Sequence, residues 1–286
     1  MGEPYRGTRL PDRVGVRDHG RMPTYTDDLG EEVALSGSPR RVVSLVPALT
    51  EAVEHTASGV IAGATDYCTH PPELDAVRVG GSKYPNVDAV LELRPDLVLA
   101  NSEENRPEDV RRLRGEGVPV WVMAAPATVP DALASLRSLL TGPFEVDAPA
   151  WLTDAEARWT DEPPAPRAHA VVPVWRKPWV VLGRDTFGGD VLRRLGVAVV
   201  YADHKDRYPR PPIDELRALF TDGTADLLVL PDEPYEFTDD DGPQFFPAPR
   251  YVLVSGRYLT WYGPSLVDAH RELSKVLPVR HDLGRV

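Results

Sequence analysis

Short apolar runs alternate with amphipathic stretches along the first part of the chain. Each run is rich in Val, Leu, Ile or Ala and ends in polar residues, which is typical of a buried strand, whereas the stretches between them show helical spacing. This alternation is typical of a parallel sheet covered by helices. The expected strands span 41–46, 59–65, 95–100 and 118–123, and the expected helices begin near Ala48, Asn86 and Pro107.

A second block repeats the pattern, and the segment between the blocks, 126–166, contains no strand pattern. That segment holds two helical stretches, "VPDALASLRSLL" and "APAWLTDAEARW", and each ends near Gly or Pro, which terminate helices. In the second block we expect strands at 169–175, 197–201, 225–230 and 250–255, and helices at 187–195, at 213–220 and from Pro264.

The pattern predicts an α/β protein with two Rossmann-like α/β lobes, each with a central parallel sheet, joined by a helical linker. Before the first lobe, "TYTDDLGEEVAL" has the pattern of a hairpin. Two lobes joined in this way imply a cleft between them. The expected limits are an N-terminal extension at 1–22, an N-terminal lobe at 23–125, a linker at 126–166 and a C-terminal lobe at 167–286.

Composition narrows the function classes. The 286 residues include 44 acidic and 32 basic side chains, a formal net charge of −12 that opposes contact with nucleic acid or anionic lipid. Cys68 is the single cysteine and cannot form an intramolecular disulfide. The first 22 residues have no apolar signal-peptide core, and no stretch approaches the roughly 18 apolar residues of a membrane span. We therefore expect a cytoplasmic monomer that does not insert into membranes, or an extracytoplasmic one if a leader is missing.

Polar and aromatic residues gather where the expected strands end. In open parallel sheets, ligands bind outside the carboxyl ends of the strands, where the loops converge and helix N-termini point inward. The strand at 95–100, for example, runs directly into "NSEEN". The candidate ligand-binding residues at these ends are Tyr67, Cys68, His70, Lys83, Asn101, Glu103, Glu104, Asn105, Trp175, Arg176, Lys177, Arg184, Asp185, Glu233, Tyr235, Trp261 and Tyr262.

Three of these residues form a candidate metal site. Cys68 and His70 in "TDYCTHPP", with Glu103 from the same lobe, offer the thiolate, imidazole and carboxylate ligands of a transition metal. The spacing C-x-H is a weak signal without a second such pair. A buried thiol beside a loop histidine explains the same residues, and a Cys-His nucleophilic dyad is a third interpretation.

Tryptophans suggest a wall for a flat ligand. Trp175 and Trp179 lie in "WRKPW", which also supplies Arg176, and Trp261 lies in "TWYG"; exposed rings bind flat molecules by stacking and cations by their faces. Core packing is the better explanation of any single one of these rings, whereas a ligand wall is the better explanation of the set. The stretch "GRDTFGGD" lacks G-x-G-x-x-G and a phosphate-loop lysine, so it does not support a nucleotide site. We interpret it as a capped turn that lines the cleft.

The motifs "RRVVSLVPALTEAV", "DYCTHPPE", "VGGSKYPNVDAVLELRPDLVLANSEENRPEDV" and "RYPRPPIDELRAL" closely resemble the helical-backbone (class III) substrate-binding proteins of ABC importers. That family includes vitamin B12 and iron-siderophore receptors, and the resemblance runs from about Thr24 to Tyr262. It is strongest to a subgroup described as helical-backbone metal receptors. The resemblance implies the same fold, two α/β lobes joined by a rigid helix.

The resemblance also implies roles for single residues. Tyr67 matches the tyrosine that contacts the corrin in cobalamin-binding members, whereas Ser82 and Asn101 fall where such a receptor has tryptophans. Asp88 and Asp214, in "NVDAVLEL" and "IDELRALF", fall where exported members carry glutamates that bind arginines of the permease.

The expected function is therefore binding of a metal chelate in the cleft, with a corrinoid or similar tetrapyrrole first and an iron-siderophore next, for an ABC importer. A bound corrinoid or metal ion would be a ligand, and no firm cofactor is expected. The alternative is a cytoplasmic metal-dependent hydrolase or chelate-processing protein on the same fold, because Cys, His and acidic residues cluster at the cleft.

Overall fold

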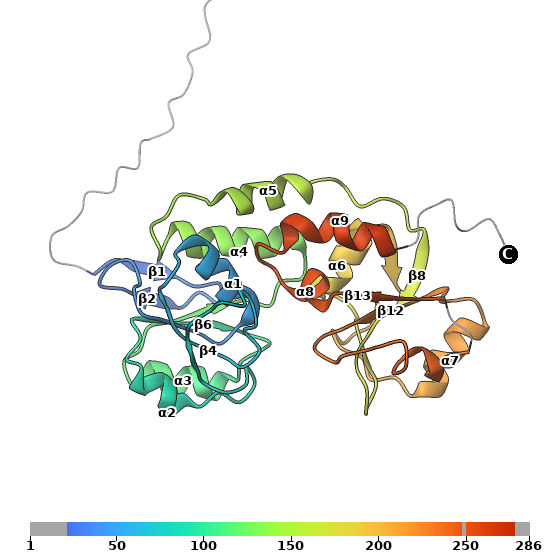
Figure 1. Ribbon diagram of the computed structural model, residues 1–286, viewed down its shortest axis with the longest axis horizontal. Coiled ribbons are helices and arrows are strands. Elements are labelled where there is room, and N and C mark those ends of the chain that lie inside the picture. The colour runs from blue at the N-terminus through green and yellow to red at the C-terminus, as the bar shows by residue number, and fades with distance from the viewer. Residues whose placement is uncertain (1–21, 248–249, 278–286) are drawn as a thin grey trace, which may run out of the picture.

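The computed structural model describes residues 22–247 and 250–277, and its strands gather into two lobes joined by helices (Figure 1). In the N-terminal lobe a five-stranded parallel sheet has the order β5-β4-β3-β6-β7. Its strands are β3 (Val42–Ser44), β4 (Ile61–Ala64), β5 (Val77–Arg78), β6 (Leu97–Asn101) and β7 (Val120–Met123). Its helices are α1 (Pro47–Thr56), α2 (Val87–Glu92) and α3 (Pro107–Gly115), and the hairpin β1 (Thr24–Thr26) and β2 (Glu32–Ala34) precedes them.

The C-terminal lobe contains a second parallel sheet, of four strands in the order β11-β8-β12-β13. Its strands are β8 (Ala168–Val171), β11 (Val197–Val199), β12 (Leu227–Pro231) and β13 (Tyr251–Val254), with a separate antiparallel pair β9 (Pro173–Trp175) and β10 (Val180–Val181). Its helices are α6 (Phe187–Arg194), α7 (Ile213–Thr221), α8 (Gly256–Thr260), α9 (Leu266–Val276) and the short 3-10 helix η1 (Pro243–Phe245).

Two helices, α4 (Val129–Thr141) and α5 (Ala150–Arg158), connect the lobes. Thr128 caps α4 by accepting a 3.2 Å hydrogen bond from the amide of Asp131. Leu136 and Leu140 of α4 are buried in a core that also contains residues of α1, β3, β8, α6 and α9. Because this core is continuous from one lobe to the other, the structure favours a fixed arrangement of the lobes over a free hinge.

The sequence pattern predicted this architecture. Every expected strand and helix of both blocks lies where the structure has one, and the hairpin-like start is the β1–β2 pair. The single strand expected at 169–175, however, is divided into β8 and β9, which belong to different sheets. The prediction missed β5, β10 and α8 because each is too short to leave an apolar period. The expected limits of the lobes stay predictions, and residues 1–21 of the expected extension lie outside the described residues. Within the described ranges, no helix combines the length and the apolar character that crossing a bilayer requires.

Candidate functional site

A cleft of about 510 Å³ lies between the carboxyl edges of the two sheets. Loops that follow β3, β4, β5, β6 and β7 line it from one side. The other side is lined by β9, the residue after β10, the start of α6, the loops after β11 and β12 and the end of α8. The cleft therefore lies where the sequence predicted it. Its lining residues are Pro47, Ala48, Tyr67, Ser82, Lys83, Asn101, Glu103, Glu104, Pro126, Val174, Trp175, Leu182, Phe187, Gly188, Tyr208, Glu233, Pro234, Thr260, Trp261 and Tyr262.

Two asparagines explain why a buried strand runs into a polar stretch at the end of β6. Asn101 Oδ1 accepts a 2.8 Å hydrogen bond from the amide of Glu103, and this Asx-type contact turns the chain. Asn105 Oδ1 accepts from the amide of Asn101 at 2.7 Å, and Asn105 Nδ2 donates to the carbonyl of Ser82 at 2.9 Å. Asn105 is buried and shapes the loop without lining the cleft. The loop holds Glu103 and Glu104 against the cleft.

Side chains from the two lobes meet directly at the cleft. Asn101 Nδ2 donates a 2.8 Å hydrogen bond to the hydroxyl of Tyr262. Glu103 accepts from Arg207 Nε at 2.9 Å and from the Tyr208 hydroxyl at 3.0 Å, both on the loop after β11. These contacts join residues more than 100 positions apart in the sequence, so they depend on how the lobes are arranged.

Two acids of the cleft have perturbed titration. Burial raises the pKa of Glu104 to about 7, against a hydrogen bond from Tyr262 that lowers it. Burial, with the charge of Asp232, also raises the pKa of Glu233 to about 7, against a hydrogen bond with Trp261. Glu104 belongs to the N-terminal lobe and Glu233 to the C-terminal lobe, so each side of the cleft contributes one acid that titrates near neutrality.

Aromatic rings are exposed on both sides of the cleft. Tyr67 is 65% exposed and Trp175 is 45% exposed, one from each lobe, and Tyr208 adds a third partly exposed ring. Trp261 and Tyr262 also line the cleft but are mostly buried. Exposing a large aromatic side chain to water is unfavourable in free energy. Several exposed rings around one cavity are therefore typical of a ligand site.

The structure does not assemble the expected metal site. The Cys68 thiol is buried and contacts the hydroxyls of Thr50 at 3.0 Å and Thr65 at 3.2 Å, away from the cleft. Burial raises its pKa, which disfavours the thiolate that a metal needs. His70 packs edge-on against Trp261 at 5.5 Å between ring centroids, and burial, followed by the charge of Arg257, lowers its pKa. No group of three potential ligands that could hold a metal ion occurs among the described residues.

Other expected ligand residues serve the C-terminal lobe itself. Arg176 is bound to Asp241 at 2.9 Å and to the Tyr235 hydroxyl at 3.1 Å, and its guanidinium lies over the ring of Phe245 at 4.8 Å. Arg184 and Asp185 pair with each other at 2.8 Å on the surface, outside the lining of the cleft. Lys177 is exposed and does not line the cleft. In "GRDTFGGD" it is Phe187 and Gly188 that reach the cleft.

The expected docking acids lie in the first turns of α2 and α7. Asp214 is 89% exposed and pairs with Arg217 at 3.3 Å, one turn further along its helix. Asp88 is exposed and pairs with Arg112 of α3. Both positions are accessible on the outside of their lobes, and their role as docking residues stays a prediction.

Sequence reasoning missed Arg207 and Tyr208, and it missed most of the apolar lining. The available signal was that "RYPRPP" comes after the strand β11, where residues of the cleft are expected. A long loop separates it from the end of that strand, so the signal was weak. The apolar residues Val174, Leu182 and Phe187 had no signal of their own, because a cleft wall and a core position have the same composition.

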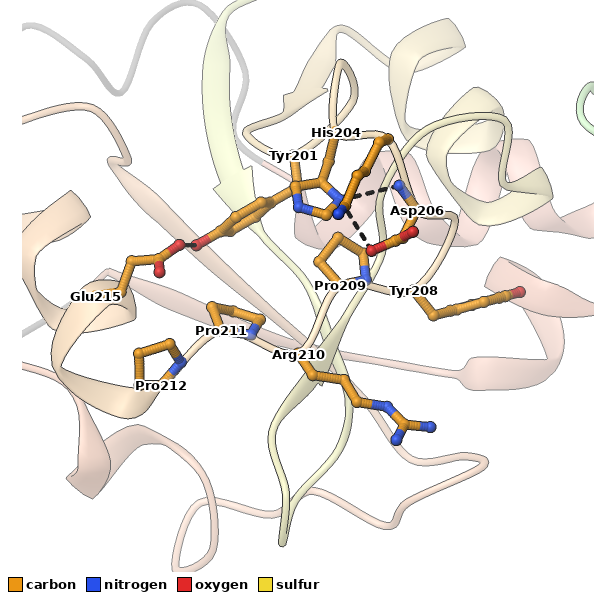
Figure 2. A pocket seen from close by; sticks show the side chains of 10 residues that line it. Tyr201, His204, Asp206, Tyr208, Pro209, Arg210, Pro211, Pro212 and Glu215 are labelled. Carbon is orange, nitrogen blue, oxygen red and sulfur yellow. Dashed lines mark hydrogen bonds and ion pairs between the residues drawn. The ribbon is translucent and has the colours of Figure 1, made fainter.

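A second pocket of about 520 Å³ lies on the C-terminal lobe and shares Tyr208 with the cleft. Figure 2 shows Tyr201 and Tyr208 extending in opposite directions from the loop between β11 and α7. The Tyr201 hydroxyl donates to Glu215 at 2.6 Å, and His204 Nδ1 accepts from the amide of Asp206 at 3.0 Å. Because these polar groups bind one another, we assign no ligand to this pocket.

No protein-family model matches the chain. It is 32% identical over 100 residues to an uncharacterised ABC transporter substrate-binding lipoprotein, YvrC, of Bacillus subtilis, which covers 34% of this chain and 32% of the relative. It is 24% identical over 186 residues to the vitamin B12-binding protein of Vibrio cholerae, which covers 62% of this chain and 66% of the relative. The alignments thus span less than two thirds of either relative.

Solved structures match over much more of the chain. The periplasmic heme-binding protein RhuT of Roseiflexus sp. RS-1 superposes with a TM-score of 0.66 at 21% identity and covers 84% of this chain and 97% of that one. The periplasmic vitamin B12-binding protein BtuF of Vibrio cholerae gives 0.62 at 18% identity, covering 83% and 96%. The heme-binding protein HmuT gives 0.68 at 19% identity, covering 95% and 96%. At these identities the likeness shows the fold.

The comparisons correct the expectation of a cytoplasmic protein, which is wrong. It rested on the absence of an apolar core in the first 22 residues. The relatives are named as a substrate-binding lipoprotein and as periplasmic binding proteins, and proteins of those kinds work outside the cytoplasm. The chain therefore has the fold of the class III periplasmic binding proteins, and its sequence relatives are named as an ABC transporter substrate-binding lipoprotein and as a vitamin B12-binding protein.

Proposed function

We propose that this chain is an extracytoplasmic substrate-binding protein that holds a metal chelate in the cleft between its lobes and delivers it to an ABC importer. A corrinoid such as cobalamin is the first candidate, a heme-like tetrapyrrole the second and an iron-siderophore the third. The relatives whose names state a ligand bind vitamin B12 or heme.

The observation that carries the proposal is the pair of exposed rings on opposite lobes, Tyr67 and Trp175, at 65% and 45% exposure. Apolar residues from both lobes, among them Pro47, Val174 and Leu182, form much of the remaining wall. Such a cleft suits a planar ligand with an apolar face, because stacking and apolar burial contribute most of the binding free energy.

The continuous core through α4 and α5 supports a receptor that changes little on binding. A cleft already formed without ligand avoids part of the entropy cost of closing two lobes. We propose that the exposed acids Asp88 and Asp214 then contact basic residues of the importer, one on each lobe.

Quenching of tryptophan fluorescence tests the proposal. Cobalamin, hemin and a ferric siderophore are titrated into the full chain, and we expect saturable quenching by at least one, because Trp175 and Trp261 line the cleft. Tyr67→Ala should weaken binding about 5- to 150-fold, the loss of one stacking contact of about 1–3 kcal/mol. Tyr84→Ala is the matched control, because Tyr84 is a 70% exposed ring of the same lobe outside the cleft. Equal loss in both variants, or no saturable quenching by any of the three, would refute the proposal.

A further inference from the structure

The geometry points to Glu104 and Glu233 as the residues that select the ligand by the charge of its periphery. They admit a chelate whose edge carries neutral hydrogen-bond donors, such as carboxamides, and they disfavour one whose edge carries carboxylates. The inference rests on the proposed function and narrows the choice of ligand. Corrinoids with amide side chains and porphyrins with carboxylate side chains both present flat rings, so the charge of the edge is what distinguishes them.

The cations near the cleft are already engaged. Arg207 is held by Glu103 at 2.9 Å, Arg176 by Asp241 at 2.9 Å, and Arg257 is paired with the buried Glu51. None of these guanidinium groups belongs to a residue that lines the cleft. Of the described residues that do line it, Lys83 is the one with a cationic side chain, and its Nζ donates to the carbonyl of Glu103 at 3.2 Å. A ligand carboxylate would therefore lack the bidentate guanidinium partner that recognises such a group best.

The two acids, by contrast, have no cationic partner of their own in the described part of the chain. Glu104 faces the Tyr262 hydroxyl, at 3.4 Å from its Oε1, together with the charges of Glu103, Glu233 and Lys83. Its environment therefore holds more negative than positive charge.

Glu233 has a comparable environment in the other lobe. It faces Trp261, and the charges around it are those of Asp232, Arg257 and Glu51. Arg257 is itself paired with Glu51, so its charge is shared. Each lobe thus contributes one carboxyl that lines the cleft. Each has one hydrogen-bond partner, Tyr262 for Glu104 and Trp261 for Glu233, and a carboxylate can accept several hydrogen bonds more.

A free carboxylate oxygen accepts a hydrogen bond from an amide N–H, and such a charge-assisted bond is stronger than a neutral one. The same oxygen repels a ligand carboxylate, and the repulsion is large because the cleft is partly desolvated. One of the two acids lies on each lobe. A bound ligand whose edge carries several carboxylates would therefore place at least one of them near Glu104 or Glu233.

Two corrinoids with the same ring provide the direct test. Dicyanocobinamide carries carboxamide side chains, and dicyanocobyrinic acid carries carboxylates in their place. We expect the full chain at pH 8 to bind the amide form at least about tenfold more tightly than the carboxylate form. Hemin, a dicarboxylate, is titrated in parallel by the same fluorescence assay.

The double variant Glu104→Gln with Glu233→Gln then tests the residues. Glutamine keeps an acceptor oxygen and removes the charge, so we expect the carboxylate form to gain about tenfold in affinity while the amide form changes by less than about threefold. Glu236→Gln is the matched control, because Glu236 is an exposed acid three positions from Glu233 and does not line the cleft.

The outcomes separate this inference from the proposed function. Equal binding of the two corrinoids, or tight binding of hemin without binding of the amide corrinoid, overturns the inference and leaves the proposed function intact. A preference for amides that survives the double variant also overturns it. Failure of these three ligands and of the ferric siderophore to bind removes the proposed function, and the inference with it.

Discussion

Asn101 at the end of β6 donates a 2.8 Å hydrogen bond to the hydroxyl of Tyr262, which lies 161 positions further along the chain. Both side chains are buried, and both belong to the lining of the cleft. The bond therefore joins the two lobes at the site itself, and it fixes the loop that presents Glu103 and Glu104.

Tyr262→Phe should destabilise the protein by about 1–3 kcal/mol, because it leaves the buried amide of Asn101 without its partner. Urea denaturation followed by circular dichroism measures the loss. Tyr258→Phe is the control on the same segment and should change stability by less than about 0.5 kcal/mol. An equal effect of both substitutions would contradict the role of the bond.

Arg207→Ala should cost less, at most about 1 kcal/mol, because its ion pair with Glu103 is partly exposed to solvent. The substitution should instead raise hydrogen exchange in the loop at 202–208, since that loop loses one of its contacts with the other lobe and keeps that of Tyr208 with Glu103. Arg210→Ala, which removes an exposed cation of the same loop, should leave the exchange unchanged. Unaltered exchange in Arg207→Ala would show that the contact does not restrain the loop.

Glu104→Gln should stabilise the protein at pH 8 and have little effect at pH 4. The folded protein raises the pKa of Glu104 to about 7, above its ordinary value of 4.5, so this group lowers stability as the pH rises from about 4.5 to 7. Because Glu104 is partly exposed to solvent, we expect the substitution to raise the free energy of unfolding by about 1 kcal/mol at pH 8. This corresponds to a rise in Tm of about 2–4 °C. Differential scanning calorimetry at the two pH values checks this, with Glu236→Gln as the control. A stabilisation that is the same at both would contradict the assigned titration.

Cys68 should react slowly with a thiol reagent at pH 8 in the folded protein and rapidly in denaturant, because burial raises its pKa and excludes the reagent. Absorbance of the released chromophore follows the reaction. Fast labelling of the folded protein would contradict this placement, as would stoichiometric zinc lost on His70→Ala.

Periodicity was sufficient to predict the two sheets and the linker, since both blocks have clear alternation of buried strands and helices. It also predicted the edge that carries the site, because "NSEEN" follows a strand whose residues are all buried. It could not tell a side chain that lines the cleft from one beside it. Trp175 and Arg176 are neighbours, yet Trp175 reaches the cleft and Arg176 turns to Tyr235 and Asp241.

Contacts between the lobes were beyond the reach of the sequence for a related reason. Glu103 binds Arg207 and Tyr208 across the cleft, and no local pattern connects residues so distant. For Cys68 and His70 the sequence left a metal site, a buried thiol beside a loop histidine and a nucleophilic dyad open, because residue types do not show packing. Packing directs the thiol to Thr50 and the imidazole to Trp261.

Native mass spectrometry with an absorption spectrum, on the full chain incubated with cobalamin, hemin or a ferric siderophore, tests the central claim most directly. The account predicts a one-to-one complex with visible absorbance that is weakened by Tyr67→Ala and by Trp175→Ala and unchanged by Tyr84→Ala. A chain that stays free of cobalamin, hemin and a ferric siderophore at saturating concentrations, or a complex that survives the loss of both rings, would contradict it.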